Sequence, residues 1–172
     1  MPKYIVDTDA GTVTPYVNTT SGTGDRMVEI LQAHRGEVEY TGFCKTVQEW
    51  FYGTLVESAW CATAISYLAE QTGLLTRNEG NENVFWLMET FRDLDGKKGT
   101  FYSTPPQTIQ KGDILFWLWK GDKMTSSSSK HVGLAEYDSA TDKIYCIGGN
   151  QKNKVCTLEY DRRYLYAVFR PY

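Results

Sequence analysis

The residues best suited to do chemistry are a cysteine near the start of a helix-like segment and one of only two histidines in the chain. Cys61 lies in segment 58–69, whose apolar residues have helical spacing and which Gly73 ends. In the first turn of a helix, a thiol faces unpaired backbone amides and the positive end of the helix dipole, which both stabilise the thiolate. His131 opens an apolar, strand-like segment and could accept the proton of this thiol.

A cysteine–histidine pair needs a third group that orients the imidazole, and Asn150 is the candidate. One strand and one turn separate it from His131, so the two residues can be neighbours on adjacent strands. Each residue also has an ordinary structural interpretation: a buried thiol, a hydrogen-bonded histidine and, for Gly148-Gly149-Asn150, a turn. The other histidine, His34, is a weaker candidate for the base, because a cation in the last turn of a helix complements the dipole.

The elements that must position these residues are helices first and strands afterwards. Apolar spacing with stop signals predicts helices over about 25–35, 42–50, 58–69 and 83–92. Short apolar runs separated by turn signals predict an antiparallel meander over 114–119, 131–137, 143–147, 155–160 and 165–170. This order indicates an α+β fold, with N-terminal helices packed on one face of a C-terminal antiparallel β-sheet.

The chain has 172 residues, of which 41% are apolar, and can bury one hydrophobic core. We divide it into an N-terminal arm or edge strand over 1–24 and one folded domain over 25–172. A net charge of −3 gives no electrostatic footprint for nucleic acid, and no segment approaches the apolar length needed for membrane insertion. The first residues lack the profile of a secretion signal, which favours synthesis in the cytoplasm without a signal peptide.

The other three cysteines, Cys44, Cys146 and Cys156, form no CxxC pair and so give no support for a structural zinc site. If a turn around 150–152 joins two antiparallel strands, Cys146 and Cys156 could face each other and form a disulfide. Two buried free thiols are the favoured alternative. Segment 7–11 resembles the start of a calcium loop but lacks its glycine and closing acid, so we expect neither a metal nor a cofactor.

Four short motifs follow one another in a fixed order along the chain. They are Trp60-Cys61-Ala62, Gly112-Asp113-Ile114, His131-Val132-Gly133 and Ile147-Gly148-Gly149-Asn150. Together with the aromatic segment 49–53, this order resembles the CHAP family, the cysteine, histidine-dependent amidohydrolases/peptidases, which are related to the NlpC-type wall peptidases. The resemblance covers residues 25–172 and implies a papain-like catalytic domain.

Carried over to this chain, the resemblance implies Cys61 as the nucleophile, His131 as the general base and Asn150 in the third position. Many relatives have a glutamate two residues before that asparagine, where this chain has Gly148. Glu136 is a weaker substitute, because strand alternation puts it on the opposite sheet face from His131. Asp113 is expected to fix its loop and to take no part in the chemistry.

The family resemblance implies a peptidoglycan hydrolase that cleaves an amide bond, either as an N-acetylmuramoyl-L-alanine amidase or as an endopeptidase of the stem peptide or cross-bridge. Aromatic residues would contact the bacterial peptidoglycan, and the candidates, each of which could instead belong to the core, are Trp50, Tyr52, Trp60, Trp117 and Trp119. We expect a monomer that acts on the cell wall after release from the cytoplasm, as phage endolysins do. The alternatives are a catalytically silent wall-binding module on the same fold and a thiol amidase that acts on small amides.

Overall fold

The computed structural model describes residues 4–7, 12–15, 22–119, 121–128 and 130–172. The α-helices of this described part are α1 (Thr23–Ala33), α2 (Gly42–Tyr52), α3 (Cys61–Gln71) and α4 (Val84–Asp93). Its strands are β1 (Tyr4–Asp7), β2 (Thr12–Pro15), β3 (Gly99–Tyr102), β4 (Ile114–Leu118), β5 (Lys130–Ala135), β6 (Lys143–Gln151), β7 (Lys154–Asp161) and β8 (Leu165–Pro171). Two short 3₁₀ helices are η1 (Arg77–Glu79) and η2 (Arg162–Tyr164).

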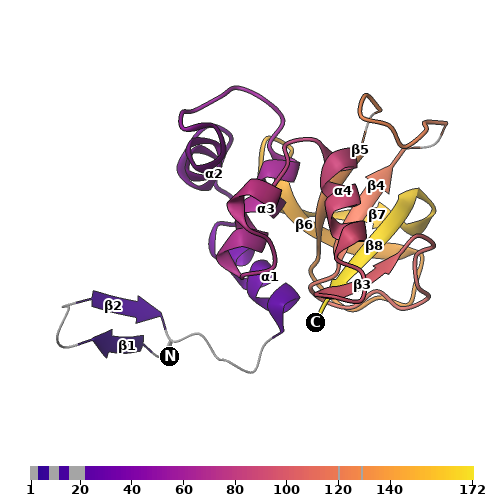
Figure 1. Ribbon diagram of the computed structural model, residues 1–172, viewed down its shortest axis with the longest axis horizontal. Helices are drawn as coiled ribbons and strands as arrows, with labels where there is room; N and C mark the ends of the chain where they lie inside the picture. The colour runs from indigo at the N-terminus through magenta and orange to yellow at the C-terminus, as the bar shows by residue number, and fades with distance from the viewer. Residues whose placement is uncertain (1–3, 8–11, 16–21, 120, 129) are drawn as a thin grey trace.

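Strands β3 to β8 form one antiparallel sheet in the order β3-β8-β4-β5-β6-β7, with the helices gathered on one side of it (Figure 1). The predicted α+β class is therefore confirmed. The meander prediction is correct for β4 to β7, but β8 returns to pair between β3 and β4 instead of lying beside β7. The sequence prediction also missed β3.

Strands β1 and β2 fall within the predicted N-terminal arm and pair with each other, from Tyr4 opposite Pro15 to Asp7 opposite Thr12. They form a two-stranded sheet of their own and are not strands of the six-stranded sheet. Helix α1 starts at Thr23, inside the segment that the sequence predicted as a break before the helix.

Apolar side chains cover both faces of the six-stranded sheet, because its strands alternate between two cores. Val132 and Leu134 of β5 join the core shared with the helices. On the opposite face, Trp117 of β4 joins a second core with Ala135. The ring of Tyr160 in β7 lies 4.9 Å from that of Trp117, although β5 and β6 separate β4 from β7 in the sheet. The sheet must therefore curl to bring these two strands together.

The hairpin between β6 and β7 turns later than the sequence predicted. Its turn is at Lys152 and Asn153, whose φ values are 52° and 57°, and Gly148-Gly149-Asn150 belongs to β6. The register pairs Cys146 with Leu158 and Gly148 with Cys156, so the two cysteines are not directly opposite each other. Both thiols are free, and the possible Cys146–Cys156 disulfide is absent.

Candidate active site

Cys61 is the first residue of α3, as the apolar spacing predicted, and its side chain is buried with 7% of its surface exposed. The preceding Trp60 packs its ring against Gly149, where a Cβ atom would come within 2.4 Å of the ring. This contact requires a glycine in β6 and holds the start of α3 against the end of that strand. The thiol consequently lies where β5 and β6 separate, because these strands pair only at Leu134–Ile147 and Ala135–Cys146.

Two opposing influences act on the Cys61 thiol. Burial is the larger and raises the pKa of Cys61. The nearby backbone amides of Val132, Ala62 and Cys61 and the charge of Lys130 lower this pKa, because they stabilise the thiolate. The helix position alone led us to expect a thiolate. In the structure burial prevails, so the resting thiol is protonated at neutral pH and needs a base to activate it.

His131 is buried on β5 directly before Val132 in the sequence, with 8% of its surface exposed. Its neighbour in sequence, Val132, supplies the amide that faces the sulfur of Cys61. Burial lowers the pKa of His131 to about 4, against a smaller opposite effect from Gln151. The imidazole is therefore neutral at pH 7 and able to accept a proton. No hydrogen bond joins Cys61 and His131 in the described part of the chain.

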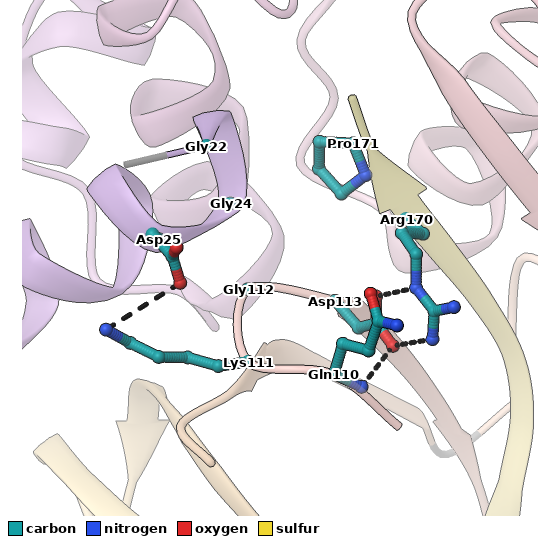
Figure 2. Close-up of a pocket in the computed structure, with 9 residues that line it drawn as sticks. All are labelled: Gly22, Gly24, Asp25, Gln110, Lys111, Gly112, Asp113, Arg170 and Pro171. Atoms are coloured by element: carbon teal, nitrogen blue, oxygen red, sulfur yellow. Dashed lines mark hydrogen bonds and ion pairs between the residues drawn. The ribbon is translucent and has the colours of Figure 1, made fainter. Parts of the chain in front are cut away.

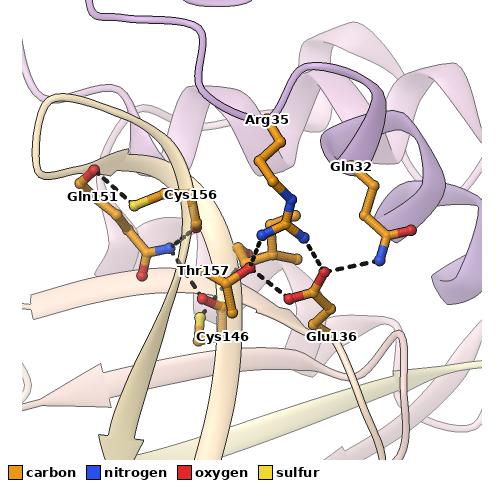
Figure 3. Close-up of polar contacts among 8 residues, drawn as sticks. Gln32, Arg35, Glu136, Cys146, Gln151, Cys156 and Thr157 are labelled. Atoms are coloured by element: carbon orange, nitrogen blue, oxygen red, sulfur yellow. Dashed lines mark hydrogen bonds and ion pairs between the residues drawn. The ribbon is translucent and has the colours of Figure 1, made fainter.

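Gln151 is the side chain that raises the pKa of His131, against the effect of burial. It is itself buried, and its Nε2 donates to the carbonyl oxygens of Cys146 and Cys156 (Figure 3). These bonds fix the amide. Oε1 of Gln151 and Nε2 of His131 are both buried without a partner that meets hydrogen-bond geometry. Gln151 therefore lies close enough to the imidazole to influence its protonation.

Gly148 lies beside both of these side chains. A Cβ atom there would lie 3.4 Å from Nε2 of His131 and 3.5 Å from Nε2 of Gln151, which is ordinary van der Waals contact. A longer side chain at this position would compete with Gln151 for the same space.

Asn150 lies one residue earlier, in a left-handed backbone conformation with φ of 57°. It is half-buried at the point where the β6–β7 register shifts, and within the described residues its side chain makes no hydrogen bond. Gln151 influences the imidazole, whereas no hydrogen bond links the predicted Asn150 to it within the described residues. Sequence reasoning missed Gln151 because the turn was placed at residues 148–150; a turn at 152–153 would have left Gln151 as the last residue of the strand.

Glu136 and Asp113 both have structural roles. Glu136 is buried on the opposite sheet face from His131, as alternation predicted, where it forms an ion pair with Arg35 and accepts hydrogen bonds from Gln32 and Thr157 (Figure 3). These contacts tie the end of α1 to the sheet. Helix α1 also ends at the other histidine, His34, whose Nδ1 lies 2.8 Å from Glu37.

Asp113 fixes its loop, as expected. Its carboxylate accepts from Nε and Nη2 of Arg170 and from the backbone amide of Gln110, each at 2.8 Å (Figure 2). This ion pair raises the pKa of Arg170. The pocket in Figure 2 lies between this loop and the start of α1, and neither Cys61 nor His131 lines it.

Of the five aromatic residues proposed to contact peptidoglycan, Trp119 is partly exposed beyond the end of β4, and the other four fall into two groups. Trp60 and Trp117 have no exposed surface. Both are therefore core residues, and the prediction that they contact the ligand is wrong. Trp50 and Tyr52 are partly exposed near the end of α2, but they already have partners in the protein. The Arg77 guanidinium lies 5.6 Å from the Trp50 ring centroid, and the Tyr52 hydroxyl donates to Glu82.

The described residues contain no group of three or more histidine, cysteine, aspartate or glutamate side chains that could hold a metal ion. None of the helices in the described part is long and apolar enough to cross a membrane. Comparisons of the chain with protein-family models, with curated proteins and with solved structures found no match.

Proposed function

We propose that the protein is a cysteine-dependent peptidoglycan hydrolase on a papain-like fold, in which Cys61 is the nucleophile and His131 the general base. The observation that carries this proposal is that the buried thiol lies at the start of α3 against the amide of Val132, the residue next to His131 in β5. The buried imidazole of His131 in turn lies near Gln151. The order of sequence motifs that resembles the CHAP family supports the same chemistry.

In the proposed reaction, His131 removes the proton of Cys61 as the sulfur attacks the carbonyl carbon of an amide bond. The resulting oxyanion accepts hydrogen bonds from backbone amides at the start of α3. When the carbon–nitrogen bond breaks, His131 returns the proton to the leaving amine, and a thioester remains on Cys61. Water then attacks the thioester with His131 again as the base, which releases the carboxylate and restores the thiol.

Gln151 would position the imidazole in this reaction. If Nε2 of His131 carries the proton and donates it to Oε1 of Gln151, the other ring nitrogen, Nδ1, is left unprotonated to accept the proton of the thiol. The amide also stabilises the imidazolium that forms, because a hydrogen bond to the charged form raises the pKa of His131. This assigns to Gln151 the role that the sequence prediction gave to Asn150.

The substrate in this proposal is bacterial peptidoglycan, cut either between muramic acid and L-alanine or within the stem peptide or cross-bridge. The enzyme would act as a monomer after release from the cytoplasm, in the manner of a phage endolysin. A catalytically silent wall-binding module and a thiol amidase for small amides are the competing functions.

The test is turnover of purified peptidoglycan by the unmodified chain, by Cys61→Ala and by the matched control Cys44→Ala, which removes a buried thiol from α2. We expect Cys61→Ala to lower the rate by at least about 10³-fold without changing the unfolding midpoint, and Cys44→Ala to remain active. Mass spectrometry of the released fragments identifies the bond from the new amino termini. Undiminished lysis by Cys61→Ala would refute the proposal, and an inert wall with a reactive small amide would favour the third function.

A further inference from the structure

Four aromatic residues on the sheet face opposite the helices form a continuous cluster that ends at His131. Tyr160 lies at its centre, with ring centroids 4.9 Å from Trp117, 5.6 Å from Trp119 and 6.1 Å from His131. Tyr164 of η2 extends the cluster beyond Trp119, at a centroid distance of 5.7 Å. We call Trp117, Trp119, Tyr160 and Tyr164 the aromatic cluster.

The aromatic cluster has a buried floor and a partly exposed rim. Trp117 has no exposed surface, whereas Trp119, Tyr160 and Tyr164 are half-buried. Within the described residues, the hydroxyls of the two tyrosines and the indole nitrogen of Trp119 have no hydrogen-bond partner, and they are not among the buried unpaired atoms. The rim therefore offers flat apolar rings whose polar edges are open to solvent, which is the pattern of aromatic residues at binding surfaces.

We infer that the exposed rim of the aromatic cluster, formed by Trp119, Tyr160 and Tyr164 over the buried Trp117, binds an N-acetylated sugar ring of peptidoglycan next to the scissile amide bond. This inference rests on the function proposed above. A pyranose ring has an apolar face of C–H groups, which suits the face of an aromatic ring, and a rim of hydroxyls, which suits the free hydroxyls of Tyr160 and Tyr164.

The charges around the aromatic cluster favour a neutral sugar over an acidic stem peptide. The Arg163 guanidinium lies over the Tyr164 ring at 4.9 Å, but its Nε is paired with Asp161 at 3.1 Å. A peptide carboxylate would have to displace Asp161 to use this cation. A sugar ring needs no such exchange.

Contact with the candidate site distinguishes the aromatic cluster from the other exposed aromatic residues. The Tyr160 ring lies between Trp119 and His131 in the cluster. A sugar ring stacked on Trp119 would therefore be separated from the proposed general base only by Tyr160. In contrast, the Trp50 ring packs against Phe51, Tyr67 and Arg77, and the Tyr52 hydroxyl is bonded to Glu82. Within the described residues, neither ring contacts His131. The aromatic cluster therefore replaces these two residues as the proposed contact for the glycan.

The experiment measures binding of a β-1,4-linked N-acetylglucosamine tetrasaccharide by calorimetry, in a Cys61→Ala background that cannot turn over substrate. We expect Trp119→Ala to weaken binding roughly tenfold and Trp119→Phe, which keeps an aromatic ring, to weaken it by about threefold or less. The matched control is Trp86→Ala, because Trp86 on α4 is 53% exposed and lies outside the aromatic cluster; its binding should not change. In the active enzyme, Trp119→Ala should raise KM for peptidoglycan about tenfold and leave kcat within about twofold.

Three results would overturn the inference: no tetrasaccharide binding at millimolar concentrations, equal effects of Trp119→Ala and Trp86→Ala, or a Trp119→Ala effect confined to sugar-free stem peptides. Each of them leaves the function of Cys61 untouched, since that is tested by loss of turnover in Cys61→Ala. Thermal unfolding checks that Trp119→Ala is folded. If it is not, Tyr164→Ala replaces it, with the same tenfold expectation for binding.

Discussion

The buried polar groups of this protein differ in how completely they are hydrogen-bonded. The carboxylates of Glu136 and Asp113, both 1% exposed, accept hydrogen bonds from several partners and each forms an ion pair with an arginine. On the face opposite Glu136, Nε2 of His131 and Oε1 of Gln151 are buried without a partner that meets hydrogen-bond geometry. Two fully bonded carboxylates thus contrast with an incompletely bonded imidazole and amide.

This difference indicates which groups hold the fold and which are available for chemistry. A buried polar atom without a partner costs about 1–3 kcal/mol, so Nε2 of His131 and Oε1 of Gln151 lower the stability of the native state. Such atoms are uncommon in native proteins and ask for a reason, which in a reactive site can be proton transfer. Satisfied carboxylates need no further function. Substitutions on the two sides of this comparison should therefore act on different properties.

The largest expected effect on stability comes from removing one of the fully hydrogen-bonded carboxylates. Asp113→Ala leaves the Arg170 guanidinium, 22% exposed, without its partner. Breaking a buried ion pair from one side typically costs 3–5 kcal/mol, and because Arg170 can still reach water we expect about 3 kcal/mol. Urea unfolding measures it. Glu159→Ala is the control, because it removes an exposed pair with Lys143 and should leave the urea midpoint nearly unchanged; equal losses would contradict the comparison.

The next largest effect is the pH dependence of stability that His131, one of the incompletely bonded groups, should cause. The pKa of His131 in the folded protein is about 4, below its ordinary value of 6.5, so the folded protein resists protonation that the unfolded chain accepts. Stability should fall as pH drops from about 6.5 to about 4, by up to about 3 kcal/mol, and level off below. His131→Gln should lose this part of the pH dependence. Urea unfolding of the unmodified chain and of His131→Gln at pH 7 and pH 4.5 provides the measurement. If both proteins lose the same free energy of unfolding at pH 4.5, His131 does not cause the pH dependence.

The smallest effect separates Gln151 from Asn150. Gln151→Ala should lower kcat on peptidoglycan roughly 10- to 100-fold, the usual range for a group that orients a reactive side chain. Gln151→Glu should raise the pH of the acidic limb of the rate profile, because a carboxylate raises the pKa of His131. Asn150→Gly keeps the left-handed backbone and should change kcat by about threefold or less. If Asn150→Gly lowers kcat as much as Gln151→Ala does, Asn150 is the residue that orients the imidazole.

The sequence predicted the elements with strong local signals. Periodic apolar residues and stop signals located all four α-helices of the described part to within about two or three residues at most ends, and placed Cys61 in the first turn of its helix. Alternation put Glu136 and His131 on opposite faces of the sheet. These properties depend on neighbours in the chain, which the sequence contains directly.

The errors concern features that depend on distant contacts. Gly148 and Gly149 read as turn residues, but Gly149 is a glycine because Trp60 approaches it closely in space. The real turn uses Lys152 and Asn153, and only Asn153 is a common turn residue. This shift moved our proposal for the third residue from Asn150 to Gln151. The position of β8 and the strong burial of Cys61 also follow from tertiary packing, which no local pattern encodes.

The position of β8 has a consequence for how the protein can fold during synthesis. This strand is the last in the chain, yet it lies between β3 and β4. Until residues 165–171 have left the ribosome, β3 lacks its only partner in the sheet and β4 has one open edge. Open strand edges are templates for aggregation. A nascent chain must therefore keep these edges apart from other chains while β5, β6 and β7 are already able to pair.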